Sequence, residues 1–543
     1  MTAGTRRWLA AAGVFAAMAA LAAVLQSRLG GGTREFTSDD GGHYFTMVVL
    51  RGLLLSGQVL APVRYIVGYF EHYQILGLGL WPPAYHMLGA VWTAVFGVSR
   101  ASVMALQAGL GAALAAAAVL AGWRPLGPWL AVVAGVGVLL SPLVLAGLPQ
   151  LQADLPTALA MFLAALAFWR LLHHGRLGDG LLFGAAALVA IMTKGNAIAL
   201  ALLPPAAVLL SGQWRLLRRA GFWVPAAVIL PVAGPWYALT YSWTSAGFRY
   251  PFGAAYTALA APFIAQQFLQ VFGPVLLILA AAAAAVAGLA RRRGDDLFTA
   301  VMLALVLATA VFQALVPAAL EPRYLLPTVA PMLLLAARGA SGLAEALAPR
   351  LASLGLQRLA APAVITAALL LPLLAAAPWT PVAGIGARTL ADEVLRRLPA
   401  SDPVLLIASD APGEGSLSVE LAMHEGPMPR VTAARGSRLL GGGGYNNFEY
   451  LPRFSSPEEA MAMVERLRIP LIVLDRTPVA GAWAHVGQLA TMLERPGAGW
   501  DRVSQVVADG RTWDLFRRRA PGEASDRTAL AVMLRPNKGP KAD

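Results

Sequence analysis

Residues 181–211 read LLFGAAALVAIMTKGNAIALALLPPAAVLLS. Two apolar runs, each near the length of a short membrane helix, flank the turn Thr193-Lys194-Gly195-Asn196. Lys194 is the only charged residue of the stretch. A lysine is expensive to place at membrane depth unless it meets an anion, so an ionisable residue there is a functional candidate. The stretch therefore predicts membrane-embedded helices around a polar turn, with Lys194 as a candidate anion-binding residue.

Composition extends the membrane assignment to most of the chain. Of 543 residues, 58% are hydrophobic and 13% are charged, with a mean hydropathy of +0.62. An ordinary soluble protein has about 25% charged residues. We therefore expect a mainly α, polytopic helical bundle. Charged residues return at soluble-protein density after about residue 380, which predicts a domain boundary between residues 1–380 and the rest.

The net charge of +13 does not indicate a nucleic-acid partner. Arg and Lys cluster in short loops between apolar stretches, as they do in the cytoplasmic loops of membrane proteins. We therefore expect membrane lipids, and no nucleic acid, as partners. The chain has no Cys, which excludes a disulfide, a thiolate nucleophile and a Cys-ligated zinc.

Apolar stretches of about 16 to 22 residues are candidates for spanning helices. They lie near residues 8–28, 83–98, 101–121, 126–146, 155–172, 181–194, 196–211, 222–243, 268–290, 297–317, 325–337 and 360–378. The first follows Arg6 and Arg7 and is too long for a signal peptide, so we expect an uncleaved helix with a cytoplasmic N-terminus. Ser141-Pro142 predicts a break in the fourth apolar stretch. A broken or re-entrant segment there would bring the total to about 13 membrane crossings, within an expected 11 to 13.

Basic loops set the expected sidedness. Those assigned to the cytoplasm are 170–176, 215–219, 291–293 and 338–358. The loops then expected outside are residues 30–80, the neighbourhoods of Asp154 and Lys194, residues 242–267 and 321–324, and the whole C-terminal domain. The unusual polar residues thus fall on one side of the membrane.

Residues 381–520 are expected to form a small α/β domain on that outer side. PVLLIAS (403–409) and IPLIVL (469–474) have the pattern of short buried strands, and residues 457–467 that of a helix with an acidic first turn. Gly441–Gly444 is expected to be a flexible loop, because no strand-to-helix phosphate loop surrounds it. Residues 521–543 are expected to be a disordered tail.

Other charged groups accompany Lys194 on the outer side. Asp39-Asp40 could supply a general base, although Ser38-Asp39-Asp40 also fits a solvated helix start. Asp154 precedes an apolar run, where the helix dipole favours a carboxylate, so structural capping is an equal alternative. Arg323 precedes another span, and its guanidinium suits a phosphate. Together these groups describe a site at the membrane interface, where a lipid-linked substrate would present its head group.

The order of the motifs resembles the GT-C superfamily of membrane glycosyltransferases, within it the branch of the lipid A aminoarabinose transferase and the protein O-mannosyltransferases. The resemblance covers about residues 1–380. It rests on Asp39-Asp40 followed by Tyr44, Trp81-Pro82-Pro83-Ala84-Tyr85, Asp154-Leu155-Pro156, Met192-Thr193-Lys194-Gly195, Pro235-Trp236-Tyr237 and Arg323-Tyr324-Leu325-Leu326-Pro327. None of these motifs is specific alone, but their order, spacing and sidedness together are.

This resemblance implies roles for individual residues. One of Asp39 and Asp40 would be the catalytic base. In the family, the first acid of the pair usually lies four residues before the tyrosine. The spacing to Tyr44 favours Asp40, whereas the position as first acid favours Asp39. Lys194 and Arg323 would bind the phosphate of a polyprenyl-phosphate sugar. The further substrate-binding candidates are Tyr44, Tyr85, Asp154 and Tyr324.

Some relatives of this kind hold a divalent metal through an external Glu and a His. Glu71 and His72 lie in the corresponding loop of this chain, but the segment up to Pro82 is longer than in the aminoarabinose transferase. Metal dependence therefore stays open. No organic cofactor is expected.

The function implied is inverting transfer of a sugar from a polyprenyl-phosphate donor, such as undecaprenyl phosphate, to a lipid, glycan or protein acceptor. The expected place is the periplasmic face of the bacterial inner membrane. The main alternative is a transporter or channel for a lipid-linked or anionic substrate, which predicts inverted repeats, and no internal repeat is visible in the sequence. A non-catalytic binding protein would leave Lys194 and Arg323 unexplained.

Overall fold

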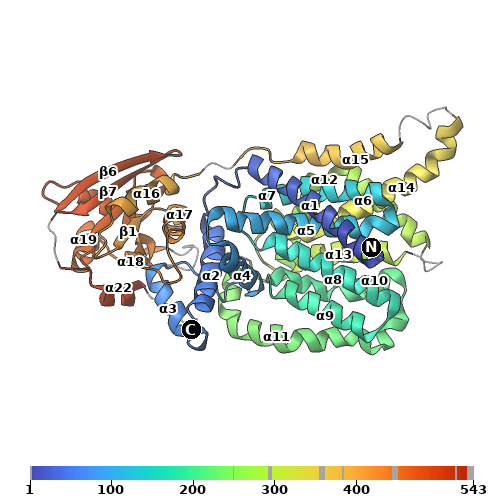
Figure 1. The fold of residues 1–543 in the computed structure, drawn as a ribbon, viewed down its shortest axis with the longest axis horizontal. Helices are drawn as coiled ribbons and strands as arrows, with labels where there is room; N and C mark the ends of the chain where they lie inside the picture. The colour runs from blue at the N-terminus through green and yellow to red at the C-terminus, as the bar shows by residue number, and fades with distance from the viewer. Residues whose placement is uncertain are drawn as a thin grey trace. The chain divides into compact units, whose positions relative to one another are not determined.

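The computed structural model of the chain describes residues 3–248, 250–290, 296–353, 361–381, 384–442, 450–519 and 523–534. The chain divides into two compact units (Figure 1). The helical unit comprises Met1–Gly31, Leu78–Tyr85 and Met104–Pro381, and the sheet unit comprises Gly32–Gly77, His86–Val103 and Val382–Asp543. The last division between the units falls between Pro381 and Val382, close to the predicted position. The assignment of the first outer loop to the transmembrane domain is wrong, because residues 32–77 pack with the C-terminal residues.

The helices of the helical unit are the apolar stretches of the sequence. They are α1 (Ala3–Arg28), α5 (Arg100–Leu126), α6 (Pro128–Leu140), α7 (Pro142–Gly147), α8 (Asp154–His174), α9 (Leu177–Ile191), η2 (Gly195–Ala201), α10 (Leu203–Ser211), η3 (Trp214–Arg218), α11 (Ala220–Thr244), η4 (Ser245–Gly247), α12 (Ala254–Ala290), α13 (Leu297–Leu315), η6 (Pro322–Thr328), α14 (Val329–Ser353) and α15 (Ala361–Ala376). The first four residues of α5 fall in the sheet unit.

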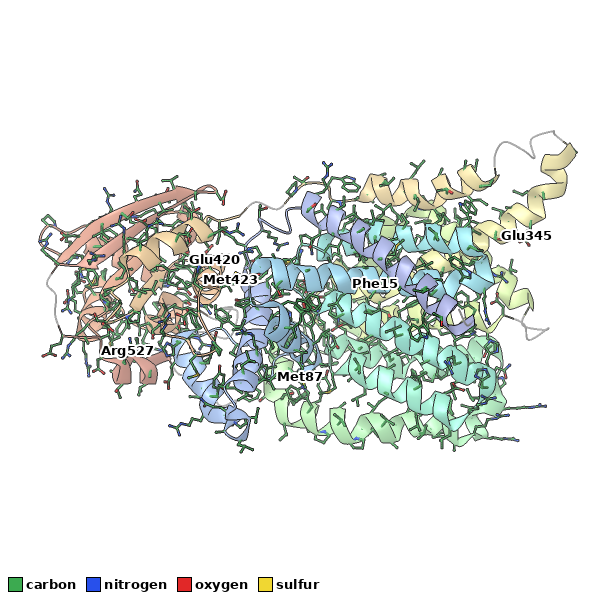
Figure 2. The ribbon with its side chains drawn as sticks, viewed as in Figure 1. Phe15, Met87, Glu345, Glu420, Met423 and Arg527 are labelled. Atoms are coloured by element: carbon green, nitrogen blue, oxygen red, sulfur yellow. The ribbon has the colours of Figure 1, made fainter. Side chains whose placement is uncertain are left out.

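Seven helices among the described residues are long and apolar enough to cross a membrane, and five shorter apolar helices of 10–17 residues accompany them. Large apolar side chains on these helices are exposed, as for a lipid-facing surface. Phe15 on α1 and Leu239 on α11 are examples, and Phe15 is labelled in Figure 2. The chain is a multi-pass membrane protein.

Small residues allow the helices of this unit to pack closely. Figure 1 shows α8, α9 and α11 side by side. A Cβ atom placed on Gly180 of α9 would lie only 2.1 Å from the carbonyl oxygen of Gly221 on α11. Likewise, a Cβ on Gly339 of α14 would collide with the backbone carbonyl of Leu279 on α12. Close backbone approach at small residues is the usual basis of helix packing in membranes, where lipid is as apolar as the helix surface.

Of two interruptions predicted between the membrane helices, one is confirmed and one is wrong. The predicted break at Ser141-Pro142 is confirmed: α6 ends at Leu140, Ser141 is extended, and α7 begins at Pro142. The predicted outer loop at residues 242–267 is wrong from Ala254 onward, where α12 begins. Gln266 and Gln267 lower the hydropathy of this segment without stopping a helix. The helix is broken instead at Gly273, with φ 65° and ψ 169°, directly before Pro274.

The sheet unit combines the first outer loop with an α/β domain. Its elements are α2 (Ser38–Leu55), η1 (Gln58–Leu60), α3 (Pro62–His72), α4 (Ala84–Phe96, whose first two residues belong to the helical unit), α16 (Ala387–Arg397), β1 (Val404–Ala408), α17 (Ala411–Ala422), β2 (Thr432–Arg435), α18 (Gly436–Leu439), β3 (Gly441–Gly442), β4 (Leu451–Pro452), α19 (Pro457–Arg466), β5 (Leu471–Asp475), α20 (Pro478–Gly481), α21 (Ala484–Leu493), β6 (Trp500–Ala508), β7 (Arg511–Arg518) and α22 (Arg527–Leu534).

The main sheet has the strand order β2-β1-β5-β7-β6. Strand β1 runs parallel to β2 and β5, whereas β7 is antiparallel to β5 and β6. The predicted strands at 403–409 and 469–474 and the helix at 457–467 are confirmed as β1, β5 and α19. The β6–β7 hairpin, at one edge of the sheet in Figure 1, was not predicted. Its signal was Asp509-Gly510, a pair with positive φ at both residues that is typical of a tight hairpin turn.

Two predictions in the C-terminal part need correction. Gly441 and Gly442 form β3 and pair with Leu451-Pro452, so this part of the glycine run is not a loop, and Gly443–Gly444 lie outside the described residues. Helix α22 lies inside the predicted disordered tail, with Leu530 and Leu534 buried in the domain core. Its apolar face explains why it packs. Residues 535–543 lie outside the described residues.

Candidate functional site

Lys194 and Asp154 form an ion pair in the helical unit. Lys194 lies in the extended turn after α9, and Asp154 is the first residue of α8. The Lys194 Nζ atom donates to Asp154 Oδ1 at 2.6 Å, and the two side chains are 12% and 6% exposed. The N-cap residue of α8 is Ala153, without a side-chain cap, and Asp154 in the first turn bonds to the lysine. The Asp154 Oδ2 atom is buried and has no hydrogen-bond partner among the described residues.

The ring of Tyr324 joins Lys194 to Arg323. Lys194 Nζ lies 4.8 Å from the centre of the ring, and Arg323 Cζ lies 5.8 Å from it. Arg323 also pairs with Glu321, whose Oε2 is 2.5 Å from Arg323 Nε, and both side chains are partly exposed. Two cation–carboxylate pairs therefore flank one aromatic ring, an arrangement that the cation–π attraction supports.

Other sequence motifs of the helical unit meet at the same turn. The backbone N–H of Ala84 donates to the carbonyl of Met192 at 2.8 Å. The hydroxyl of Tyr237 donates to the carbonyl of Ile191 at 3.0 Å. The motifs at residues 81–85, 192–195 and 235–237, distant in sequence, are thus in direct contact around Lys194.

Tyr85 is held in place by this packing. It is fully buried, and its hydroxyl donates to Gln107 Oε1 at 3.0 Å. Gln107 Nε2 in turn donates to the carbonyl of Gln152 at 3.2 Å, two residues before Asp154. Its position supports the backbone that presents Asp154, and contact of Tyr85 with substrate stays a prediction.

The charges of this site suit an anion. Lysine has three N–H donors, of which the bond to Asp154 uses one. Arginine has five donors in a planar fork that matches phosphate oxygens. Because a carboxylate accompanies each cation, both cations keep a partner when no ligand is bound, and an entering phosphate would compete with or share these carboxylates.

The Asp39-Asp40 pair lies in the sheet unit, in the first turn of α2. The predicted solvated helix start is wrong for Asp40, which is 1% exposed and has an Oδ2 atom 3.5 Å from Arg34 Nη2. Asp39 is half-buried. The N-cap residue Thr37 makes no side-chain cap. The two neighbouring carboxylates therefore have different environments, which primary sequence could not distinguish.

The loop before this pair is anchored to the α/β domain within the sheet unit. The Glu35 carboxylate accepts from the backbone N–H of Ile385 at 2.7 Å and of Arg388 at 3.0 Å, at the start of α16. The Ser416 hydroxyl donates to the carbonyl of Phe36 at 3.0 Å. These three bonds fix the backbone just ahead of Asp39 and Asp40.

A buried ion pair adds to this anchor. Arg100 pairs with Glu420 of α17 and also donates to the carbonyl of Arg34, and Figure 2 labels Glu420 on that helix. The Arg100 guanidinium lies 4.7 Å from the centre of the Phe36 ring. Burial of two charges is costly unless they are paired and hydrogen-bonded. The pair was missed from sequence because its partners are far apart in the chain.

Tyr44 has a packing role. Its side chain is fully buried and its hydroxyl donates to the carbonyl of Val98 at 3.1 Å. Burial raises the pKa of the Tyr44 hydroxyl well above its ordinary value. These contacts hold α2 in place, and contact of Tyr44 with substrate stays a prediction.

Two histidines near the acidic pair were also missed. His43, one helical turn after Asp40, has its Nδ1 2.9 Å from Nε2 of His86 on α4, and the rings are stacked. Both side chains are buried. The spacing from Asp40 to His43 was the available signal, since residues three apart share a helix face.

Glu71 and His72, the metal candidates, end α3. His72 Nδ1 donates to the carbonyl of Val431 at 3.0 Å and lies 3.1 Å from the Thr432 hydroxyl. Across the described ranges, no three His, Asp or Glu side chains gather as a metal-binding group. The residues present thus do not form a metal site of the usual ligand number, and metal dependence stays a prediction.

Comparisons with known proteins give a family-model match over part of the chain and a shared fold. Residues 81–238 match the family model described as dolichyl-phosphate-mannose-protein mannosyltransferase. ArnT from Cupriavidus metallidurans in the apo state aligns with a TM-score of 0.60 at 18% identity, over 94% of this chain and 100% of that chain. The chain has a GT-C fold. The resemblance predicted from the motifs is confirmed.

Two further structures share the GT-C fold. ArnT from the same organism bound to undecaprenyl phosphate aligns with a TM-score of 0.58 at 18% identity, over 94% of this chain and 98% of that chain. The oligosaccharyltransferase of Archaeoglobus fulgidus tethered with an acceptor peptide aligns at 0.52 and 13% identity, over 88% and 72%. No curated protein gives a significant match. The family match covers residues 81–238, which contain Tyr85, Asp154, Lys194 and Tyr237.

Proposed function

We propose that the chain is an inverting glycosyltransferase that moves a sugar from a polyprenyl-phosphate donor to a lipid, glycan or protein acceptor. The observation that carries the proposal is the convergence of separate sequence motifs on Lys194: Asp154 at 2.6 Å, the ring of Tyr324 at 4.8 Å, and the backbone contacts of Ala84 and Tyr237 beside the same turn. A costly intramembrane cation surrounded in this way fits a phosphate head group. The ArnT relative bound to undecaprenyl phosphate supports the same class of donor.

In the proposed reaction, an acceptor O–H or N–H attacks the anomeric carbon of the sugar. A bond forms between the acceptor atom and this carbon as the bond from the carbon to the phosphate oxygen breaks on the opposite face. The electron pair leaves with the lipid phosphate, and the acceptor proton passes to a carboxylate. Lys194 and Arg323 stabilise the charge that develops on the departing phosphate.

We assign the base to Asp39 rather than Asp40. A general base must come within hydrogen-bond reach of the proton that it removes. Asp39 is half-buried, whereas Asp40 is buried beside Arg34. Asp40 is then a positioning residue that holds the first turn of α2 through Arg34.

We place the reaction on the periplasmic face of the bacterial inner membrane, with the N-terminus in the cytoplasm and the C-terminal domain in the periplasm. The basic loop around Arg170 and the basic segment Arg215–Arg219 support this orientation, because Lys and Arg concentrate in short cytoplasmic loops. Cysteine-labelling of single-Cys variants at positions 176 and 386 in intact cells tests the sidedness, since the natural chain has no Cys.

The function is tested by sugar transfer from undecaprenyl-phosphate sugars in reconstituted vesicles, together with mass spectrometry of lipid that remains bound to the purified protein. Asp39→Asn should lower the transfer rate by about 10²- to 10⁴-fold, the usual contribution of a general base. Asp40→Asn should reduce folded yield more than the turnover of the folded fraction. Full activity in both variants and in Lys194→Ala would refute the proposal.

A further inference from the structure

Four exposed arginines lie at the end of the helical unit that is remote from Lys194. Helix α9 has 15 residues and ends at the turn that contains Lys194, so its first residue is about 22 Å from that turn at 1.5 Å per residue. The arginines lie directly before α9, within η3 and directly before α11, and we call them the basic surface: Arg176, Arg215, Arg218 and Arg219. They are too far from Lys194 to bind the same phosphate.

Backbone contacts join the two chain segments that carry the basic surface. A Cβ atom placed on Gly221 of α11 would lie 2.9 Å from the carbonyl oxygen of Arg176. The Arg219 Nη1 atom donates to the carbonyl of His174 at 3.3 Å, and a Cβ atom on Gly175 would lie 2.5 Å from the same Nη1 atom. The loop between α8 and α9 therefore packs against the start of α11, which brings Arg176 and Arg219 to one place.

The short helix η3 places two further arginines side by side. It is a 3-10 helix, in which residues three apart eclipse one another, so Arg215 and Arg218 lie on the same side of it. Leu216 between them is buried, whereas both arginines are exposed. Like charges on adjacent turns repel each other. An anion that contacts both guanidinium groups would relieve this repulsion.

Carboxylates do not neutralise the basic surface. From residue 155 to residue 290 the sequence contains one acidic residue, Asp179. Its Oδ1 atom accepts from Arg170 Nε at 3.2 Å, and its Oδ2 atom lies 3.1 Å from His174 Nδ1. Among the residues that the structure describes, no carboxylate pairs with any arginine of the basic surface. The positive charge of this surface is therefore available to an anion from outside the chain.

Two tryptophans flank the basic surface and indicate its depth in the membrane. Trp214 and Trp223 are 53% and 63% exposed. The Trp223 Nε1 atom donates to the carbonyl of Leu217 at 2.9 Å, so the polar edge of the ring is bonded at η3 while most of the ring stays exposed. Exposed tryptophans are typical of the boundary between lipid hydrocarbon and head groups. The arginines next to them thus lie at the level of lipid phosphates.

We propose that the basic surface binds the head group of an anionic phospholipid, such as phosphatidylglycerol or cardiolipin. Arg215 and Arg218 donate to the lipid phosphate, and Arg176 and Arg219 add to the positive potential around it. Arginine suits this ligand because its planar fork of N–H donors matches phosphate oxygens. Basic groups between transmembrane helices recognise anionic head groups in the same way. The inference does not depend on the proposed function.

The double variant Arg215→Gln/Arg218→Gln tests the proposal. Purified protein in a neutral detergent is titrated with dioctanoylphosphatidylglycerol, and bound lipid is measured by native mass spectrometry. In wild type, this lipid should bind more tightly than dioctanoylphosphatidylcholine, and added salt should weaken its binding because salt screens exposed charges. Each arginine near a lipid head group contributes a factor of about 5 in affinity, so the Kd should rise about 10- to 30-fold in the double variant.

A second variant tests the other chain segment of the basic surface. Arg176→Gln should raise the Kd of dioctanoylphosphatidylglycerol about 5-fold by the same reasoning. It gives an independent measurement if the double variant folds poorly, which thermal unfolding in the same detergent would show.

Arg430→Gln/Arg466→Gln is the matched control. Both arginines are exposed, belong to the sheet unit and pair with no carboxylate among the described residues. The control changes the net charge as much as the test variant does, and it should bind the lipid as wild type does. Lys194→Met/Asp154→Asn should also bind it as wild type does, because that site lies at the opposite end of α9.

Four results would overturn the proposal. They are equal affinities of wild type for the anionic and the zwitterionic lipid, an unchanged Kd in both variants of the basic surface, an equal rise of the Kd in the matched control, and displacement of the lipid by millimolar inorganic phosphate. The last result would indicate a site for a free anion instead of a lipid. Loss of binding in Lys194→Met/Asp154→Asn alone would place the lipid at the Lys194 turn and would also refute the assignment.

Discussion

Replacing Lys194 by Met should lower both the stability of the protein and its affinity for a lipid phosphate, and a second substitution should separate the two effects. At the 2.6 Å between Lys194 Nζ and Asp154 Oδ1, two unit charges attract by about 6 kcal/mol at an effective dielectric constant of about 20. Desolvation of the pair offsets much of this attraction. Removing one partner leaves a buried carboxylate uncompensated, so we expect Lys194→Met to lower the free energy of unfolding by about 3 to 5 kcal/mol.

The double variant Lys194→Met/Asp154→Asn removes both charges and should recover most of the lost stability, because a neutral pair leaves no buried charge unpaired. Phosphate binding should not recover. A lysine about 4 Å from a phosphate charge contributes about 4 kcal/mol at the same dielectric constant, and each 1.4 kcal/mol is a factor of about ten in Kd. The affinity for undecaprenyl phosphate should therefore fall by up to about 10³-fold in both variants.

Thermal unfolding in detergent and binding of undecaprenyl phosphate in nanodiscs measure the two quantities on the same preparations. Arg170→Met is the matched control, since Arg170 also pairs with a carboxylate, at 3.2 Å in Asp179, but is more than half exposed. It should change stability by less than about 1 kcal/mol and leave binding unchanged. Wild-type affinity in Lys194→Met would refute the phosphate assignment, and a double variant as unstable as the single one would refute the account of the ion pair.

Three further predictions concern pH, anchoring and helix packing. Burial lowers the pKa of His72 despite its bond to the Val431 carbonyl, so the free energy of unfolding should fall as pH drops from about 6.5 through the lowered pKa, and His72→Gln should flatten this part of the pH profile. Glu420→Gln leaves Arg100 without its buried charge partner, so it should cost about 3 to 5 kcal/mol and lower kcat of the folded fraction more than it raises KM. Gly180→Val places side-chain atoms against a backbone carbonyl, so the folded yield should drop sharply.

Each of these predictions has a control at a residue of the same type in the same unit. His424→Gln, at an exposed residue of the same unit, should leave the pH profile as steep as in wild type. Glu458→Gln removes a carboxylate whose pair with Arg495 is about half exposed, and should leave stability almost unchanged because exposed ion pairs contribute little. Gly178→Ala meets no atom within 4 Å and should fold normally. If a control variant changed the pH profile, the stability or the folded yield as much as its test variant does, the physical explanation given for that test variant would be wrong.

The local sequence was sufficient to predict most individual helices and strands, but not which distant segments contact one another. Hydropathy located α13, α8 and the break at Ser141-Pro142, because an apolar run of spanning length and a proline act on their own segment. It missed the first half of α12, where two glutamines interrupt the apolar run of a continuous helix. It also placed residues 32–77 with the transmembrane helices, because the bonds from Glu35 to the start of α16 join segments more than 350 residues apart.

Candidate residues of the site follow the same division. Lys194, Asp154 and Arg323 were identifiable from sequence, since a charge inside or beside an apolar run is conspicuous wherever the chain folds. Their relation to Tyr324 could not be identified from the sequence, and neither could the burial of Tyr44 and Tyr85.

The sequence by itself determined the class of the protein, the order of its membrane helices, the α/β domain and the presence of a lysine within the apolar helices, because hydropathy, charge and helix-breaking residues act over one or two turns. Only the tertiary structure decided that Asp154 pairs with Lys194 and that Asp40 is buried beside Arg34. Burial and pairing depend on which distant segments come into contact, and the free energy of a charged or polar group is set by that contact rather than by its neighbours in sequence.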